Sequence, residues 1–283
     1  MDIKAVGVVG CGLMGAGIVE TCARAGYSVV VREVNDGLLQ AGLKRIEGSL
    51  GKAVERGKLT PEARAATWAR IKGATALEDL AGSDLVIEAV IENMALKKEV
   101  FSALDRLCPP HTILSSNTSS LSITEMAAAT RRPGQVIGLH FFNPVPVMPL
   151  LEIVRALLTG DDTLEFAKSF GASLSKTTIV AKDTPGFIVN LLLIPFLLDA
   201  IRALESGKAT REDIDTGVKL GLNHPMGPLT LGDFVGLDTT LFVADAIYEE
   251  LKDPRYAAPT LLRRLVMAGR LGRKSGAGFY DYK

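Results

Sequence analysis

The segment Lys4-Ala-Val-Gly-Val-Val-Gly-Cys-Gly-Leu-Met-Gly15 decides the fold of this chain. Its first half is a run of small and branched apolar residues, which predicts a short buried strand. Glycines then follow in the spacing Gly-x-Gly-x-x-Gly, and a helical pattern continues through Ile18 to about Arg24. A strand that turns into a helix in this way presents the N–H groups of the helix N-terminus to an anion. The segment therefore predicts phosphate binding at a strand-to-helix turn.

The residues around this turn extend the prediction to a dinucleotide. Gly10 permits the tight turn, Gly12 lets the backbone approach a pyrophosphate, and Gly15 lets the helix pack closely on the strand. A second strand over 28–31 is followed by Glu33, where an acidic residue should hold a ribose hydroxyl. The adjacent Arg32 could pair with a 2'-phosphate, so NAD is favoured while NADP stays open. The predicted cofactor-binding residues at this end are Gly10, Gly12, Leu13, Met14, Gly15 and Glu33.

Composition sets the broad class. The chain has 283 residues, 47% of them hydrophobic, which is enough for two domains and a substantial core. Lys+Arg and Asp+Glu both number 32, so net charge gives no reason to expect a nucleic-acid or membrane partner. Cys11, Cys22 and Cys108 have neither paired nor metal-ligand spacing, and we expect small core residues and no metal. A strand starting near Met1 and no apolar run of roughly 20 residues predict a soluble, cytoplasmic protein.

The pattern along the chain predicts two domains. Up to residue 183, short apolar runs alternate with helical periodicity, which indicates a Rossmann-type doubly wound sheet of the α/β class. Strands are predicted at 28–31, 85–89, 112–115, 136–140, 151–154 and 178–180. Beyond the turn at 182–186 the strand signal disappears, and residues 184–283 should form an all-α C-terminal domain, with helices at 187–206, 210–220, 238–251 and 260–268. The apolar helix at 187–206 is either central to that domain or buried between two copies, and we expect a homodimer through this domain.

His140 is the candidate general base. It lies in Leu139-His-Phe-Phe-Asn-Pro-Val-Pro146, at the end of a predicted strand, with Glu152 not far along the chain. A histidine titrates near neutrality, and a carboxylate on its other ring nitrogen fixes the tautomer. The alternative is a hydrogen-bonded core histidine. His111 and His224 lie in turns, so His140 is selected by elimination.

Other polar residues follow neighbouring strands. Glu88 and Glu92 follow the third strand, and the run Ser115–Ser120 follows the fourth. Ligands of doubly wound sheets bind at the carboxyl ends of the strands, so these groups should face the nicotinamide half of the cofactor. A Ser/Thr-rich loop before a helix is also typical of an N-cap, for which Ser122 and Glu125 supply a capping box.

Several of these segments together resemble the L-3-hydroxyacyl-CoA dehydrogenase family. The matching motifs are Gly10-Cys-Gly-Leu-Met-Gly-Ala-Gly17, Ser116-Asn-Thr-Ser-Ser-Leu121, His140-Phe-Phe-Asn-Pro144, Asp183-Thr-Pro-Gly-Phe-Ile-Val-Asn190, His224-Pro-Met-Gly-Pro228 and Gly276-Ala-Gly-Phe-Tyr280. The resemblance covers essentially the whole chain. The length and single-enzyme layout are most similar to the bacterial 3-hydroxybutyryl-CoA dehydrogenases of that family.

The resemblance implies an activity and a set of residues. The reaction would be reversible hydride transfer between a 3-hydroxyacyl-CoA and NAD, with His140 as base and Glu152 orienting it. Ser119 and Asn190 would contact the substrate or the transition state. The residues implied to touch NAD are Glu33, Glu92, Lys97, Ser119, Asn143 and Lys274, and those implied to bind coenzyme A are Ser49, Lys52, Arg56 and Ser119. Arg56 stands where the family usually has Lys, which keeps a cation in place.

Two other functions stay open at this stage. A dehydrogenase of a small hydroxy acid or sugar acid would share the cofactor domain but would not need coenzyme A. The cations Lys44, Arg45, Lys52, Arg56 and Lys58 argue against it, because a phosphorylated ligand requires such a cluster, although a solvated helix face has the same composition. A dinucleotide-binding sensor without turnover would not need the set Ser119, His140, Glu152 and Asn190.

Overall fold

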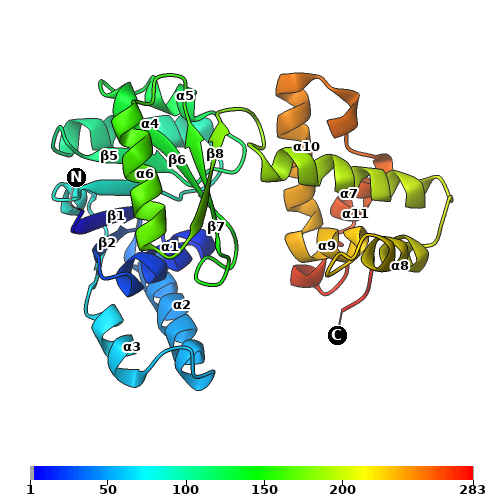
Figure 1. The fold of residues 1–283 in the computed structure, drawn as a ribbon, viewed down its shortest axis with the longest axis horizontal. Helices are drawn as coiled ribbons and strands as arrows, with labels where there is room; N and C mark the ends of the chain where they lie inside the picture. The colour runs from blue at the N-terminus through cyan, green and yellow to red at the C-terminus, as the bar shows by residue number, and fades with distance from the viewer. Residues whose placement is uncertain (1–2, 283) are drawn as a thin grey trace. The chain divides into compact units, whose positions relative to one another are not determined.

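The computed structural model describes residues 3–282. The chain divides into two compact units, one ending at Asp183 and the other beginning at Thr184 (Figure 1). The first unit is built on a sheet, and the second is helical. This confirms the predicted class, an α/β doubly wound domain followed by an all-α domain.

The first unit contains one eight-stranded sheet within the described residues, in the order β3-β2-β1-β4-β5-β6-β7-β8. Neighbouring strands are parallel except for β6 and β7, which are antiparallel. The chain order reverses between β1 and β4, which is where ligands bind in this architecture. The strands are β1 (Ala5–Val9), β2 (Ser28–Arg32), β3 (Ile71–Ala74), β4 (Leu85–Glu88), β5 (Ile113–Ser116), β6 (Val136–Phe141), β7 (Leu150–Arg155) and β8 (Thr177–Lys182).

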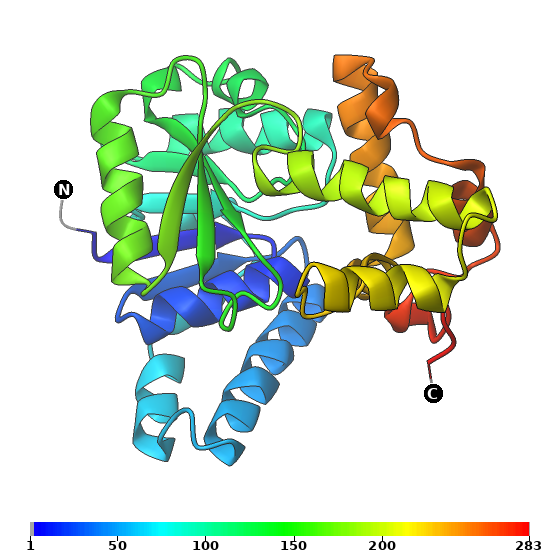
Figure 2. The same ribbon diagram turned by 45° about the vertical axis from the view of Figure 1, so that its right-hand side comes forward.

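Helices cover both faces of this sheet. On one face, residues of α1 and α6 share a core cluster with the strands, as Figures 1 and 2 show for the two helices. On α4, Phe101 and Leu104 are buried. The pair α2 and α3 projects away from the sheet as a helical excursion (Figure 1). The helices of this unit are α1 (Leu13–Arg24), α2 (Asp36–Glu55), α3 (Pro61–Trp68), α4 (Met94–Leu107), α5 (Ile123–Ala127) and α6 (Asp161–Ser173).

The second unit is a bundle whose core is built around α7. The helices are α7 (Val189–Glu205), α8 (Arg211–Gly221), α9 (Pro228–Val235), α10 (Leu237–Leu251) and α11 (Thr260–Met267). Ile194, Leu198 and Ile201 of α7 belong to the buried cluster, so this apolar, Pro-containing helix is central to its own unit. Two elements were not predicted from the sequence, β3 and α9. Both are short and interrupted or flanked by glycine, which weakens the local pattern.

Two buried aspartates hold the end of the chain against this bundle. Asp233 accepts hydrogen bonds from the N–H groups of Phe279 (2.9 Å) and Tyr280 (3.0 Å). Asp215 accepts from the N–H of Leu229 (2.8 Å) and the hydroxyl of Tyr280 (3.0 Å). A Cβ on Gly278 would lie 1.9 Å from an Asp233 carboxylate oxygen. The Gly-Ala-Gly-Phe-Tyr motif is therefore structural.

Two features are absent from residues 3–282. No helix there combines the length and apolar character that a membrane span requires. No group of His, Cys, Asp and Glu side chains in the same range could hold a metal ion.

Candidate functional site

The strand-to-helix turn after β1 leaves an open helix N-terminus. Gly10 has φ of 97°, and a Cβ on Gly15 would lie 1.9 Å from the Gly10 carbonyl oxygen, so both positions require glycine. Gly12 is the N-cap of α1, without a side-chain capping bond, and apart from Gly12 itself and its two chain neighbours no described atom lies within 4 Å of the position of its Cβ. The first turn has no acidic residue. An uncapped helix N-terminus beside open space fits the pyrophosphate of a dinucleotide.

Glu33 is anchored at the edge of this turn. Its carboxylate accepts from the N–H of Cys11 at 2.8 Å and from the N–H of Val34 at 2.9 Å. The neighbouring Arg32 points to the other side of β2, where its Nε donates to the carbonyl of Thr75 at 3.1 Å. The acid is thus beside the glycine turn, and the cation is held against the chain that follows β3.

The cysteines near the turn are packing residues. Cys11, Cys22 and Cys108 are free and buried. Burial raises the pKa of Cys11 and Cys108 to about 11 and that of Cys22 to about 12, so the thiols stay protonated at neutral pH. Cys11 also packs against α2, where a Cβ on Gly42 would lie 2.2 Å from its sulfur. These residues therefore contribute volume, as expected from the sequence.

His140 and Glu152 are cross-strand neighbours on β6 and β7. The antiparallel register pairs the two residues directly. His140 Nδ1 lies 2.7 Å from Glu152 Oε2, the carboxylate is fully buried, and the imidazole is 6% exposed. A carboxylate at this distance holds Nδ1 as the donor and fixes the plane of the ring. His111, by contrast, is half exposed beside Asp84, and His224 belongs to the second unit, where it packs on Phe196.

Ser119 lies in a loop that is fixed by Glu92. The Glu92 Oε1 atom accepts from the Ser119 N–H (2.9 Å) and from the hydroxyls of Thr118 (2.9 Å) and Ser119 (3.3 Å). Lys97, which the resemblance places against NAD, is only 1% exposed, and its ammonium contacts Glu88 at 2.7 Å and Glu92 at 3.2 Å. Sequence reasoning placed Glu88 near the nicotinamide, but in the structure its carboxylate is buried behind the loop.

The loop ends in a helix cap that differs from the expected capping box. Ser122 accepts from the Glu125 N–H at 3.2 Å, as an N-cap should. The Glu125 side chain instead pairs with Lys98 at 3.1 Å. The carboxylate of Asp183 accepts from the N–H groups of Ile123 (2.9 Å) and Thr124 (2.6 Å) and from the Ser122 hydroxyl. A residue 60 positions away therefore completes the cap, which local sequence could not reveal.

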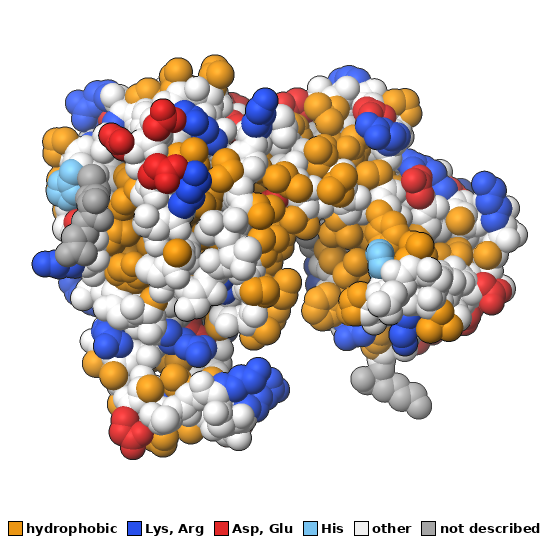
Figure 3. All heavy atoms as spheres, in the orientation of Figure 1, with side chains coloured by type: hydrophobic (Ala, Val, Ile, Leu, Met, Phe, Trp, Pro, Cys, Tyr) orange, Lys and Arg blue, Asp and Glu red, His pale blue; other side chains and the backbone are white. Residues whose placement is uncertain are grey.

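A cationic cavity of about 710 Å³ lies between α1, α2 and the loop after β6. It is lined by the three residues implied to bind coenzyme A, Ser49, Lys52 and Arg56, and also by Asn143. Lysine and arginine side chains gather over the α2–α3 excursion in Figure 3. Sequence reasoning missed two other lining residues, Glu20 and Arg24 of α1, because they are separated in sequence from α2. Burial raises the pKa of the Glu20 carboxyl, an effect that Ser49 and Arg24 partly offset.

Two of the implied residues belong to the second unit. Asn190 is the second residue of α7. Lys274 lies in a short 3-10 turn, where its ammonium is 2.6 Å from a carboxylate oxygen of Asp238.

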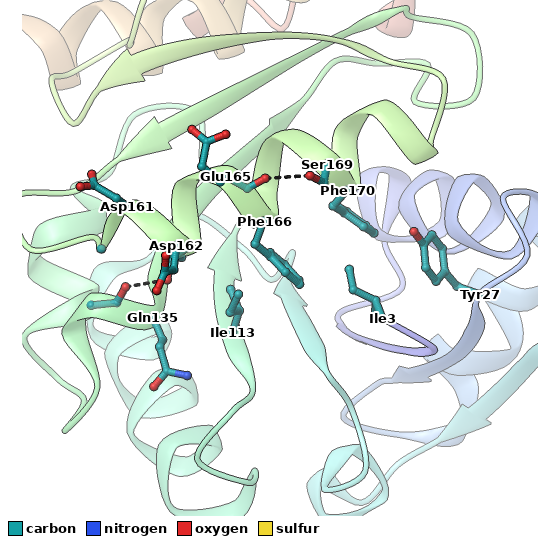
Figure 4. Close-up of a pocket in the computed structure, with 13 residues that line it drawn as sticks. Ile3, Tyr27, Ile113, Gln135, Asp161, Asp162, Glu165, Phe166, Ser169 and Phe170 are labelled. Atoms are coloured by element: carbon teal, nitrogen blue, oxygen red, sulfur yellow. Dashed lines mark hydrogen bonds between the residues drawn. The ribbon is translucent and has the colours of Figure 1, made fainter. Parts of the chain in front are cut away.

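Another cavity, of about 1050 Å³, contains none of the predicted site residues. Figure 4 shows its lining, which includes Ile113 at the start of β5, Gln135 just before β6, and the α6 residues Phe166 and Phe170. It therefore lies at the amino ends of these strands, whereas ligands of this architecture bind at the carboxyl ends.

Comparison with known proteins gives the same two-part division. Residues 5–184 match the model of the 3-hydroxyacyl-CoA dehydrogenase NAD binding domain, and residues 186–282 match that of the 3-hydroxyacyl-CoA dehydrogenase C-terminal domain. A 3-hydroxybutyryl-CoA dehydrogenase of Mycobacterium tuberculosis (strain ATCC 25618 / H37Rv) is 51% identical over 282 residues, covering 99% of this chain and 99% of the relative. The human mitochondrial hydroxyacyl-coenzyme A dehydrogenase is 44% identical over 289 residues, covering 99% of this chain and 92% of the relative. The crystal structure of (S)-3-hydroxybutyryl-CoA dehydrogenase PaaH1 from Ralstonia eutropha has a TM-score of 0.95, with 45% identity and full coverage of both chains.

The fold and the buried acid–base pair define the class, a dinucleotide-binding oxidoreductase. The comparisons narrow it: the chain belongs to the 3-hydroxyacyl-CoA dehydrogenase family. The family membership confirms the resemblance that the sequence motifs indicated. The comparisons do not favour a dehydrogenase that acts on a small hydroxy acid or sugar acid without coenzyme A.

The two glycines of the turn should respond differently to substitution. In Gly12→Ala the new methyl group enters open space, so we expect thermal stability to change by no more than about 1 kcal/mol, the scale of an N-cap effect. It occupies the approach of a pyrophosphate, so the NADH dissociation constant should rise at least about tenfold. In Gly15→Ala the new methyl group would clash with the Gly10 carbonyl oxygen, so this substitution should mainly lower the melting temperature. Unchanged NADH affinity in a folded Gly12→Ala protein, measured by fluorescence titration, would place the dinucleotide elsewhere.

Proposed function

We propose that this protein is an NAD-dependent (S)-3-hydroxybutyryl-CoA dehydrogenase, which interconverts a short-chain 3-hydroxyacyl-CoA and its 3-ketoacyl-CoA. The observation that carries the proposal is the buried His140–Glu152 pair, 2.7 Å apart, which joins β6, the strand that follows the Ser119 loop, to its neighbour β7. Sequence identity of 48% and 51%, over 100% and 99% of this chain, to two relatives named probable 3-hydroxybutyryl-CoA dehydrogenase and 3-hydroxybutyryl-CoA dehydrogenase supports the substrate class. A sensor without turnover has no use for a buried general base held by a carboxylate.

The proposed mechanism assigns the proton to His140 and its orientation to Glu152. Because Glu152 engages Nδ1, the proton from the substrate 3-hydroxyl passes to Nε2 during oxidation and returns from Nε2 during reduction. The buried carboxylate stabilises the imidazolium that forms. NAD, when bound, supplies the nicotinamide carbon that accepts the hydride from substrate C3. Ser119, in a loop that Glu92 fixes, is proposed to hold the substrate oxygen.

Replacing the base should reduce turnover without removing the cofactor. His140→Gln keeps a polar side chain of similar size, and kcat should fall by roughly 10²- to 10⁴-fold, the range for a positioned acid–base group. The NADH dissociation constant should stay within about threefold of the native value, since the imidazole acts on the proton. His111→Gln, at an exposed position, is the matched control and should retain native turnover. A folded His140→Gln protein with native kcat for acetoacetyl-CoA reduction would refute this mechanism.

We propose NAD as the preferred cofactor over NADP. Glu33 is held beside the glycine turn by two backbone N–H groups, where it can accept from ribose hydroxyls and repel a 2'-phosphate. Arg32 is bonded to the Thr75 carbonyl and so is not arranged to offset that repulsion. The Glu33 carboxylate therefore determines the preference for NAD over NADP.

The cofactor preference gives a test that separates these two residues. Native kcat/KM should be at least about tenfold higher with NADH than with NADPH, equivalent to about 1.4 kcal/mol. Glu33→Ala should bring the two values closer together, whereas Arg32→Ala should leave the ratio within about twofold. If Arg32→Ala, rather than Glu33→Ala, changes the ratio, then the arginine faces the ribose and the assignment is reversed.

We propose that the cavity between α1 and α2 binds the phosphorylated end of coenzyme A. Lys52 and Arg56 line it from the end of α2, joined by Lys44, Arg45 and Lys58, so that cations of one helical excursion converge on one hollow. Cations on such an exposed surface attract a polyanion, and salt screens that attraction over about 10 Å at 0.1 M ionic strength. An exposed helix face that binds nothing would not need to line a cavity.

Charge reversal at the cavity should affect the acyl-CoA substrate selectively. The double variant Lys52→Glu with Arg56→Glu should raise KM for acetoacetyl-CoA by roughly tenfold or more, or about 1.4 kcal/mol. It should leave the NADH dissociation constant within about twofold. The matched control is Lys168→Glu, an exposed lysine of α6 paired with Glu165. A pantetheine thioester lacks the phosphates, so its KM should be the same for the native protein, the double variant and the Lys168→Glu control. If the KM for acetoacetyl-CoA is also the same for all three proteins, the cationic cluster is only a solvated helix face.

We further propose that the helical unit mediates a homodimer. Large apolar side chains are exposed on it, among them Leu220 (75%), Leu222 (61%) and Met267 (86%). Apolar surface of this kind is typical of a surface that a second copy covers. Sedimentation equilibrium measures the mass directly, and a monomer at micromolar concentration would refute the proposal.

A further inference from the structure

We infer that Glu88 and Lys97 are positioning residues that act through Glu92 to hold the loop carrying Ser119. This inference rests on the proposed function for the role of Ser119 in the reaction, although the arrangement of the loop can be tested without it. Neither Glu88 nor Lys97 touches the reacting atoms in this assignment. Their effect is to fix where the Ser119 hydroxyl lies.

Glu88 is the innermost group of this network. It is the last residue of β4, and it is fully buried. One carboxylate oxygen accepts from the Val90 N–H and from the Lys97 ammonium, each at 2.7 Å. The other accepts from the Ser116 hydroxyl at 2.6 Å, and the Ser116 oxygen in turn accepts from the Thr118 N–H at 3.1 Å. Each carboxylate oxygen is thus engaged, as a buried charge requires.

Lys97 connects this buried carboxylate to a more exposed one. Its ammonium lies 2.7 Å from Glu88 Oε1 and 3.2 Å from Glu92 Oε2. Glu92 is 28% exposed, whereas Lys97 and Glu88 are enclosed. A lysine buried to this extent is stable as a cation only with such partners. The Lys97 ammonium donates a hydrogen bond to Glu88. Its contact with Glu92 Oε2 is an ion pair without hydrogen-bond geometry, so the ammonium attracts that end of the Glu92 carboxylate through its charge.

Glu92 then holds the loop with its other oxygen. Oε1 accepts from the N–H of Ser119 and from the hydroxyls of Thr118 and Ser119. The loop is also tied to the strand that carries His140, because Asn117 Oδ1 accepts from the Phe141 N–H at 2.9 Å. The Asn117 N–H donates to the Glu88 carbonyl at 2.8 Å. The network therefore sets the position of Ser119 relative to the chain around His140.

The charge on Glu88, and not only its shape, carries this effect. If Glu88 is made neutral, the Lys97 ammonium loses its closer partner and has Glu92 alone as a counter-charge. Glu92 is then drawn toward the lysine, and the bonds from Oε1 to the loop weaken. Lys98, the next residue of α4, forms an exposed pair with Glu125 and lies outside the network. It provides a control at an adjacent position.

The test compares Glu88→Gln and Lys97→Met with the control Lys98→Met. The first measurement is amide hydrogen exchange of the Ser119 N–H in the protein without ligands. We expect exchange to be at least about tenfold faster in Glu88→Gln and Lys97→Met, and unchanged in Lys98→Met. Unchanged exchange in both network variants would overturn the inference, whatever reaction the protein catalyses.

The second measurement separates positioning from stability. In Glu88→Gln we expect kcat for acetoacetyl-CoA reduction to fall by roughly 10- to 100-fold, with the KM for acetoacetyl-CoA and the NADH dissociation constant changed less than about threefold. A role in stability alone would lower the melting temperature and leave kcat of the folded protein at the native value, and that result would overturn the inference. If the native protein does not reduce acetoacetyl-CoA, the proposed function is refuted. The exchange measurement then still decides whether Glu88 and Lys97 hold the loop that carries Ser119.

A milder variant keeps the test decisive if Glu88→Gln does not fold. Ser116→Ala removes one neutral donor to Glu88 and leaves all three charges in place. It should fold, speed up exchange of the Thr118 and Ser119 N–H groups, and lower kcat by about threefold to tenfold. Native exchange and native kcat in Ser116→Ala, together with an unfolded Glu88→Gln protein, would assign Glu88 to folding alone and overturn the inference.

Discussion

The antiparallel pairing of β6 with β7 is the constraint on which the chemistry depends. In an antiparallel pair, directly opposed residues share a face and have Cβ atoms about 5 Å apart, so the register alone brings His140 and Glu152 into contact. A one-residue slip would turn the two side chains to opposite faces of the sheet. The apolar residues flanking them, Leu139 and Phe141 on one strand and Leu151 and Ile153 on the other, oppose such a slip because all are buried. The core that stabilises the sheet also orients the proposed base.

The remaining groups meet because the parallel strands end at one edge. The glycine turn follows β1, Glu33 follows β2, Glu92 comes just after β4 and Ser119 just after β5, while His140 is the last residue but one of β6. The chain order reverses between β1 and β4, which opens a crevice for a dinucleotide at that point. The chemistry thus uses short loops whose positions are set by strands buried on both faces.

Much of this could be predicted from sequence, because the decisive signals are local. The glycine spacing, the acid after β2 and the alternation of apolar runs with helices each depend on a few consecutive residues, and they predicted the α/β class and the all-α second unit. The contacts that the sequence did not predict are those between residues far apart in the chain. Asp183 completes the cap at Ser122, and Glu125 turns to Lys98 instead. The burial of Lys97 between two carboxylates could not be predicted, because Glu88 ends β4, Glu92 lies in the following loop and Lys97 is on α4, and sequence spacing alone does not bring a strand end, a loop and a helix together.

The charged residues of the candidate site and of the cavity between α1 and α2 form two groups with different physical properties. Glu88, Lys97, His140 and Glu152 are buried and paired at short distances, so their arrangement is fixed before any ligand binds. A preorganised site of this kind spends no energy on reorientation during the reaction. Lys52, Arg56 and Lys58 instead lie at the end of α2 and just beyond it, around an open cavity. Cations around an open cavity suit the phosphorylated ligand proposed above, because their attraction to it acts over distance and falls with salt. In the proposed mechanism, the buried pairs therefore serve the reaction, and the cations around the cavity serve the binding of the substrate phosphates.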